Sequence, residues 1–112
     1  MWNGQPEGLL IALGTSSLLA LNLCRWRGSS VGAERIKGAY AWRTLRTAGA
    51  RLIFNSDLTG SDHNVFYGLH SAITRQDKTG QPAGGWYPGE RMTPEEAVRG
   101  YSTWAAYAAF AE

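Results

Sequence analysis

Apolar residues recur at a helical period in the stretch that ends near the middle of the chain. A helix has about 3.6 residues per turn, and five apolar side chains between residues 33 and 48 follow that spacing closely: Ile36, Ala39, Tyr40, Leu45 and Ala48. Gly49 comes next, and glycine is typical of the position where a helix ends in the left-handed conformation. The pattern predicts one helix over residues 33–48.

A short run without alternation follows this helix. Leu52, Ile53 and Phe54 are consecutive apolar residues, and the run stops at Asn55–Asp57. A continuous apolar run of this length is typical of a strand buried on both faces, as in parallel sheets. Helix, glycine, short turn and strand together predict an αβ unit.

Two further helices are predicted after the strand. The first spans residues 65–75 and places Phe66, Leu69, Ala72 and Ile73 along one side. A long connection rich in glycine and proline, residues 77–89, follows it, and connections of this length often form lids or walls of functional sites.

The last helix has the clearest start. Thr93, Pro94 and Glu96 stand at the N-cap, first and third positions of a capping box. Aromatic residues then recur every three positions, and we expect them to form a buried face: Tyr101, Trp104, Tyr107 and Phe110.

The first thirty residues have a different composition. Only Glu7, Arg25 and Arg27 are charged there, and the apolar run Leu9–Leu23 is interrupted by polar residues. A membrane span needs about 20 mostly apolar residues, and a secretory signal carries its positive charges before the apolar run, not after it. We therefore divide the chain into a leader, residues 1–30, which packs against the rest or has no settled partner, and residues 31–112. A small membrane-associated protein using Leu9–Leu23 remains an alternative.

Composition narrows the class of protein without defining a function. The chain has 112 residues, of which 44% are apolar and 18% charged, with a formal net charge of +2. These values are typical of a folded soluble chain, and the near balance of charge does not favour nucleic acid as a partner. The single cysteine, Cys24, excludes an internal disulfide, and no histidine stands near it to make it a nucleophile.

Three side chains are candidates for chemistry. Asp57 directly follows the predicted strand, where α/β folds place their active sites, although it could equally cap the following turn. His63 lies in the next loop and could face a substrate. His70 is expected on a helix surface. His63 and His70 are seven positions apart, which is too far for both to bind one metal ion from a single regular helix.

Five blocks of sequence resemble the C-terminal part of the amidohydrolase-3 group, which includes N-substituted formamide deformylases. The blocks keep their order across about 80 residues, from Val31 to Glu112: Gly32–Arg43, Ala48–Asp57, Gly68–Arg75, Gly85–Pro88, and Arg91–Ala97 with Trp104–Phe110.

The resemblance implies a fold and a chemistry. It implies the C-terminal segment of a (β/α)8 barrel that binds a divalent metal, usually zinc, and hydrolyses amide or formamide carbon–nitrogen bonds of small molecules. It places Asp57 on the last strand's aspartate, which contacts the metal or its water and acts as general base. We further expect a cytoplasmic protein with no nucleic-acid or membrane partner.

The chain also departs from the group's pattern. It has no His-x-His, and no histidine precedes His63; Asn55 and Thr59 replace the usual glycine and proline. A whole barrel takes about 250 residues, so the resemblance implies an incomplete barrel of helix–strand–helix–helix order. We expect the chain alone to bind metal weakly and to be inactive as a hydrolase. The alternative is a non-catalytic helical remnant that self-associates or binds a partner.

Overall fold

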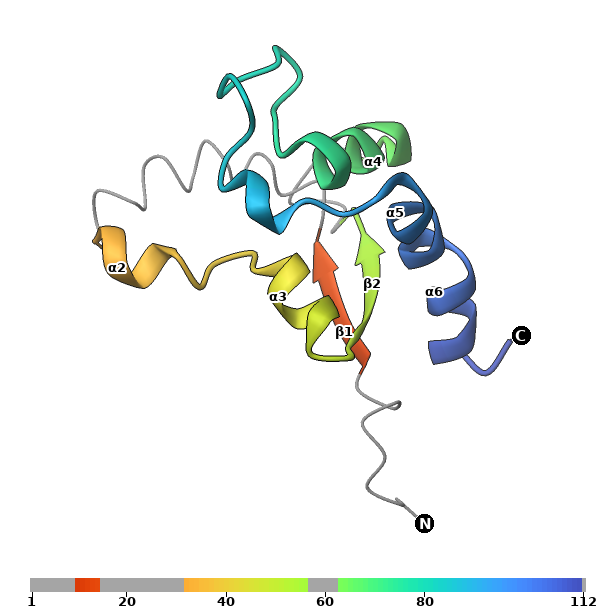
Figure 1. Cartoon of the computed structure of the whole chain (residues 1–112). Coiled ribbons are helices and arrows are strands. Elements are labelled where there is room, and N and C mark those ends of the chain that lie inside the picture. The colour runs from red at the N-terminus through yellow and green to blue at the C-terminus, as the bar shows by residue number, and fades with distance from the viewer. Residues whose placement is uncertain (1–9, 15–31, 57–62, 112) are drawn as a thin grey trace.

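A computed structural model describes residues 10–14, 32–56 and 63–111 of the chain (Figure 1). The elements in order are β1 (Leu10–Gly14), α2 (Ala33–Ile36), α3 (Trp42–Thr47), β2 (Arg51–Asn55), α4 (Val65–Thr74), the 3-10 helix η2 (Pro88–Glu90), α5 (Pro94–Tyr101) and α6 (Thr103–Ala108). The observed order is therefore strand, two helices, strand and further helices. It contains one strand more than the sequence predicted.

The two strands lie side by side and run parallel. Leu10 pairs with Arg51 and Gly14 with Asn55, so both strands end at the same level. Parallel neighbours require a crossover connection, and α2 and α3 lie within it. β1 belongs to the segment that we assigned to a leader of uncertain structure. Within the described residues there are two strands and no closed barrel.

The helix predicted over residues 33–48 is in fact two helices. α2 ends at Ile36 and α3 begins at Trp42, with Tyr40 between them at a φ of 53°. A left-handed residue cannot continue a right-handed helix, so the chain turns at this position. The predicted end is confirmed, since Gly49 follows α3 with a φ of 94°.

β2 is buried on one face and not on both. Leu52 and Phe54 are 0% and 3% exposed, whereas Arg51 and Ile53 are half-buried and Asn55 is exposed. Helices α3, α4, α5 and α6 all contact β2. The prediction of two buried faces was wrong for this chain because these helices bury only alternate residues of the strand.

The core lies between β2 and the helices. Its buried members come from β2, from the helices α3, α4, α5 and α6, and from two connecting segments: Trp42, Ala50, Leu52, Phe54, Ala72, Met92, Ala97 and Trp104. In Figure 1, α3 lies on one side of the strands and α5 with α6 on the other, while α4 lies towards the tips of the arrows. Gly100 of α5 is buried against β2, because a Cβ there would come within 2.5 Å of Cδ2 of Phe54.

Two predicted apolar faces are only partly buried. On α4, Ala72 is fully buried, but Phe66 is 80% exposed. The last predicted helix breaks at Ser102, whose φ and ψ of −130° and −92° separate α5 from α6. Trp104 is buried, whereas Phe110 lies beyond α6 and is 95% exposed. The expectation that these aromatic residues form one buried face was therefore wrong at its C-terminal end.

Candidate functional site

The carboxyl ends of the two parallel strands form one edge of the sheet. Gly14 of β1 lies opposite Asn55 of β2, and Ser56 continues the chain beyond β2. Asn55 is exposed and Ser56 is half-buried. In α/β folds and barrels this edge carries the functional residues, because the loops that leave it converge there. It is the candidate site of this chain.

Asp57, the principal candidate, follows Ser56 directly but lies outside the described residues. Its place in the sequence puts it one residue past the described part of this edge. Its predicted contact with a metal or water therefore stays a prediction.

His63 precedes α4 and is exposed. Its neighbour Asn64 is the N-cap of α4, and the Asn64 side chain accepts a hydrogen bond of 3.0 Å from the backbone N–H of Phe66. This cap holds the start of α4, so the backbone at His63 leads into a helix end of defined geometry. Its contact with a substrate stays a prediction.

His70 lies on the exposed surface of α4, as predicted. Its Nε2 is 3.1 Å from the carbonyl oxygen of Asp77, and its ring stacks on that of Tyr67 with 6.5 Å between centroids. These contacts join His70 to the connection after α4. They do not bring His70 together with His63.

We tested whether the described residues fit a metal ion. Among residues 10–14, 32–56 and 63–111, no three histidine, cysteine, aspartate or glutamate side chains lie close enough together to bind one. A catalytic zinc takes three protein ligands and keeps one position open for water. The described part of the chain therefore does not by itself fit such a metal.

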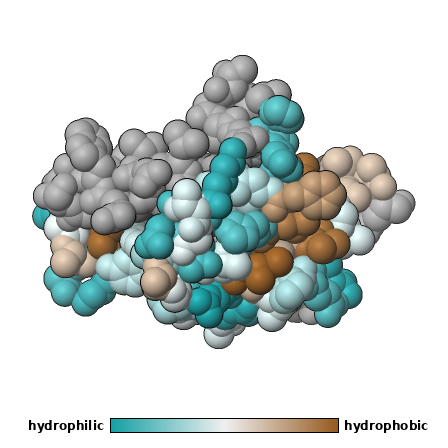
Figure 2. Space-filling model, turned by 90° about the horizontal axis from the view of Figure 1, so that it is seen from above, coloured by the Kyte–Doolittle hydropathy of each residue, from teal (hydrophilic) through white to brown (hydrophobic). Residues whose placement is uncertain are grey.

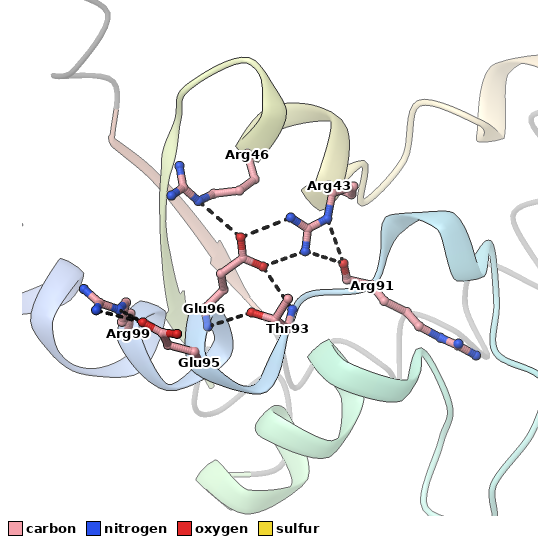
Figure 3. A network of polar contacts seen from close by, with 7 residues as sticks. All are labelled: Arg43, Arg46, Arg91, Thr93, Glu95, Glu96 and Arg99. Carbon is pink, nitrogen blue, oxygen red and sulfur yellow. Dashed lines mark hydrogen bonds and ion pairs between the residues drawn. The ribbon is translucent and has the colours of Figure 1, made fainter.

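A polar network that the sequence did not reveal joins α3 to the start of α5. The Glu96 carboxylate accepts two hydrogen bonds from the Arg43 guanidinium, of 2.6 and 3.0 Å, and Nε of Arg46 lies 3.5 Å from it (Figure 3). The Arg43 guanidinium also donates to the carbonyl oxygen of Arg91. Sequence spacing could not reveal these pairs, because Arg43 and Glu96 are 53 positions apart.

The predicted capping box is part of the same network. Oγ1 of Thr93 accepts from the Glu96 backbone N–H, and the Glu96 carboxylate accepts from the Thr93 backbone N–H. The hydrogen bonds from Arg43 contribute most to lowering the pKa of Glu96 to about 2. One carboxylate thus caps α5 and holds α3 beside it.

Glu90 makes a second link to α3. Its carboxylate accepts hydrogen bonds from the backbone N–H and the hydroxyl of Thr44. Burial acts to raise the pKa of Glu90, but the hydrogen bonds from Thr44 and from the Arg43 backbone, together with the charge of Arg75, outweigh it and the pKa is lowered. Both carboxylates accept hydrogen bonds that join α3 to the segment from η2 to the start of α5.

A parallel αβ unit with polar residues at the carboxyl edge of its strands is common to many classes of α/β enzyme. Comparison with known families identifies the protein family to which this chain belongs. The chain belongs to the amidohydrolase family, whose model matches residues 10–112. No curated protein and no solved structure matches it.

The family match confirms the resemblance found in the sequence and extends it. It begins at Leu10, before the Val31 boundary of that resemblance, and so includes β1. Members of this family are generally metal-dependent hydrolases, and the match marks the chain as part of such a hydrolase domain.

In the described part of the chain, no helix combines the length and apolar character needed to cross a membrane.

Proposed function

We propose that this chain is the C-terminal part of a metal-dependent hydrolase that cleaves amide or formamide carbon–nitrogen bonds other than peptide bonds. The family match over residues 10–112 carries this proposal. The parallel pairing of β1 with β2 supports it, because strands of a (β/α)8 barrel run parallel and end at one catalytic edge. The substrate is a small molecule, and N-substituted formamides are the first class to test.

Asp57 is the residue that we propose for the chemistry of the complete enzyme. As a carboxylate at the end of a barrel strand, it would accept a proton from the attacking water and return it to the leaving amine. His63 would contact the substrate from the loop that follows. The complete site would use a divalent metal, with zinc as our proposal, to lower the pKa of the bound water towards 7.

The chain alone should not turn over substrate. Its described residues bring no three metal-ligating side chains together, and its sequence has no His-x-His. We propose that the metal ligands other than Asp57 come from polypeptide that this sequence does not contain. Zinc bound by the isolated chain should therefore be weak and readily removed by dialysis.

The direct test is an assay of the purified chain with zinc, using N-formyl and simple amide substrates. We expect no turnover above that of free zinc. Turnover that is lost in Asp57→Asn but kept in the matched variant Asp77→Asn would refute the proposed inactivity and support the role of Asp57. Turnover equal in both variants would refute the role of Asp57.

A second experiment tests the origin of the chain. Translation of the DNA upstream of the Met1 codon, in all frames, should yield a barrel half with a His-x-His if the gene is split or its start displaced. Joining that half to this chain should then restore hydrolysis. A joined protein that folds and binds zinc but hydrolyses neither substrate class would refute the proposed reaction.

A non-catalytic, self-associating protein is the second candidate, and surface exposure favours it. Phe66, Val98 and Phe110 are 80%, 52% and 95% exposed. On the face shown in Figure 2, the larger part of the strongly apolar surface lies on one side. Contiguous exposed apolar surface commonly marks an interface. Sedimentation should show association that weakens in Phe66→Ser; a monomer with cooperative unfolding would refute this candidate.

A further inference from the structure

Arg75 is a buried arginine at the C-terminal end of α4. Only 1% of it is exposed, and its backbone has a φ of 61°, in the left-handed region. Its N–H donates to the carbonyl oxygen of Ser71, which ends the helix. Burial of a guanidinium is unfavourable unless polar and aromatic partners surround it, so the contacts of Arg75 indicate what it holds in place.

The guanidinium lies between two tryptophan rings. Its central carbon is 4.6 Å from the ring centroid of Trp42 and 4.9 Å from that of Trp86. Nη1 donates to the carbonyl oxygen of Tyr40 at 2.9 Å, and Nε donates to that of Trp86 at 3.0 Å. A planar guanidinium can stack and donate in its own plane at once, which lysine cannot. Arg75 thus joins α4, the turn before α3, and Trp86.

Arg75 and Trp86 are bonded in both directions. Besides the side-chain bond, the Trp86 N–H donates to the backbone carbonyl oxygen of Arg75 at 2.8 Å. The chain between them, residues 76–85, leaves and returns at this one point. It is a compact surface loop with adjoining ends, of the kind called an Ω-loop. We call it the 76–85 loop.

The 76–85 loop has its own internal hydrogen bonds. Oδ1 of Asp77 accepts from the backbone N–H groups of Thr79 and Gln81, and Nε2 of Gln76 donates to the carbonyl oxygens of Gly80 and Pro82. These bonds lie within the loop, so they can persist whether or not the loop is docked. The loop can therefore keep its own conformation when its contacts with the rest of the chain break.

Three further contacts of the loop with the rest of the chain each include at least one exposed side chain. Arg91 donates from Nη2 to the carbonyl oxygen of Gly84, Lys78 lies over the Tyr67 ring at 4.8 Å, and His70 approaches Asp77. Exposed contacts of this kind are individually weak. Arg75 makes a buried polar attachment of the loop, beside the close approach of Gly85 to the Thr74 carbonyl oxygen, and we expect it to control docking.

Backbone strain gathers at the same point. Tyr40, Arg75 and Tyr87 are not glycines, yet their φ angles are 53°, 61° and 43°. Such conformations persist where surrounding contacts enforce them, and they cluster at elements that switch between states. All three flank the guanidinium contacts, so release of Arg75 removes the contacts that hold them.

We propose that the Arg75 side chain acts as a clasp, which means that it holds the 76–85 loop docked on the rest of the chain. The loop and Trp86 open and close as one unit while the core stays folded. In Figure 1 this loop rises at the end of the molecule towards which the strand arrows point. Opening therefore alters access to the end that carries the candidate site. The proposal concerns a motion and does not rest on the proposed hydrolase function.

Native-state hydrogen exchange of the unaltered chain is the first test. The backbone amide of Trp86 is hydrogen-bonded to Arg75 across the ends of the loop, whereas those of Asp77, Gly80 and Gly85 are bonded within it. We expect the Trp86 amide to exchange through an opening at least about tenfold more favourable than that of the core amide of Ala97, and the three amides within the loop to be left protected by that opening. A Trp86 amide that exchanges only with the core, or loop amides that lose protection together with it, would overturn the proposal.

Limited trypsin digestion of variants is the second test. Lys78 is the single lysine or arginine between residues 76 and 90, so cleavage after it reports on the loop. In Arg75→Gly the clasp is lost while glycine tolerates the positive φ. We expect cleavage after Lys78 to be at least about tenfold faster in this variant, and millimolar methylguanidinium to slow it by refilling the space between the tryptophans.

Arg99→Ala is the matched control, since it removes an exposed arginine that pairs with Glu95 on α5. Its cleavage rate after Lys78 should equal that of the unaltered chain. An unchanged Lys78 rate in Arg75→Gly would overturn the proposal. An equal acceleration at Arg43 and Arg91 would also overturn it, because Arg75 would then belong to the core's own unfolding unit.

Discussion

The face of β2 that carries Leu52 and Phe54 lies against helices, whereas Ile53, between them, is only half-buried on the opposite face. On the helix side, the Phe54 ring lies 5.4 Å from that of Trp42 and 5.8 Å from that of Tyr101. Both faces are equally apolar in sequence over these three residues. The difference shows that the helices of this chain cover one face of β2 and leave the opposite face less protected.

The polar network in Figure 3 belongs to the covered side. It fastens α3 to α5, the two helices that contribute Trp42 and Ala97 to the core. The carboxyl edge of β2, in contrast, ends in exposed Asn55. We therefore expect the stability of the fold to depend mainly on the face of β2 that the helices cover. We expect the candidate chemistry at the carboxyl edge of the strand. Substitutions on the two sides can test this division.

The largest expected effect is that of Phe54→Ala. Removal of a buried aromatic side chain typically costs about 3–5 kcal/mol of unfolding free energy, and we expect a loss in that range from urea unfolding followed by tryptophan fluorescence. Ile53→Ala, on the other face, should cost about 1–2 kcal/mol because its side chain is only half-buried. Phe66→Ala is the control for removing an exposed ring and should change little. Equal losses for Phe54 and Ile53 would contradict the division.

Gly100→Ala tests how closely α5 approaches the covered face. The added Cβ would lie 2.5 Å from Cδ2 of Phe54 and 3.0 Å from the carbonyl oxygen of Leu52. Overpacking of this kind costs about 1–3 kcal/mol, measured as a lower midpoint of thermal unfolding. Gly89→Ala is the matched control, since a Cβ added at Gly89 would have nothing within 4 Å. A stable Gly100→Ala would mean that α5 can retreat without loss of packing.

Glu96→Gln tests the fastening between α3 and α5. Glutamine keeps the shape and the capping bond but removes the charge that Arg43 pairs with, so we expect a loss of about 1–2 kcal/mol at neutral pH, reduced by partial exposure of the pair. The pKa of Glu96 is about 2 when folded and 4.5 at its ordinary value. Because the folded pKa is lowered, its stabilisation is complete above pH 4.5 and declines as the pH falls towards 2.

Unfolding measured between these pH values should therefore separate the two proteins. The unaltered chain should lose stability over this acidic range more steeply than Glu96→Gln does. Glu90, whose pKa is also lowered, contributes in the same direction and remains in both proteins. Parallel pH profiles for the two proteins would show that Glu96 does not provide this stabilisation.

Thr93→Ala should have the smallest effect of the series. It removes the hydroxyl that accepts from the Glu96 N–H at the start of α5, and loss of an N-cap costs about 1 kcal/mol. Thr103→Ala provides the comparison, because Thr103 is exposed at the start of α6 and is not an N-cap. Equal effects in circular dichroism melting would argue that the cap contributes no more than helix propensity.

Local signals in the sequence predicted local structure well. Gly49 marked the end of a helix, and the Thr93–Glu96 capping box started α5, because both signals act within a few residues. The strand over Leu52–Phe54 was found and is one residue longer at each end. The position of His70 on a helix surface was also confirmed.

Several wrong or missed predictions concern features that depend on residues far apart in the sequence. The turn at Tyr40 interrupts an apolar pattern that looked continuous, and its carbonyl oxygen is held by Arg75, 35 positions away. The break at Ser102 also interrupts the aromatic stripe, and Phe110 beyond α6 is exposed. β1 was missed because its pairing with β2 joins residues some forty positions apart. No short-range periodicity carries such information.

By itself, the sequence determined the family, the strand at Leu52–Phe54, the glycine end of α3 and the capped start of α5, because short apolar runs, caps and family blocks are local properties of the chain. Only the tertiary structure decided which face of β2 is covered, which carboxylate fastens α3 to α5, and that Arg75 lies between Trp42 and Trp86. Those outcomes depend on packing between segments far apart in the sequence, where burial makes each polar group find a partner that no neighbour along the chain supplies.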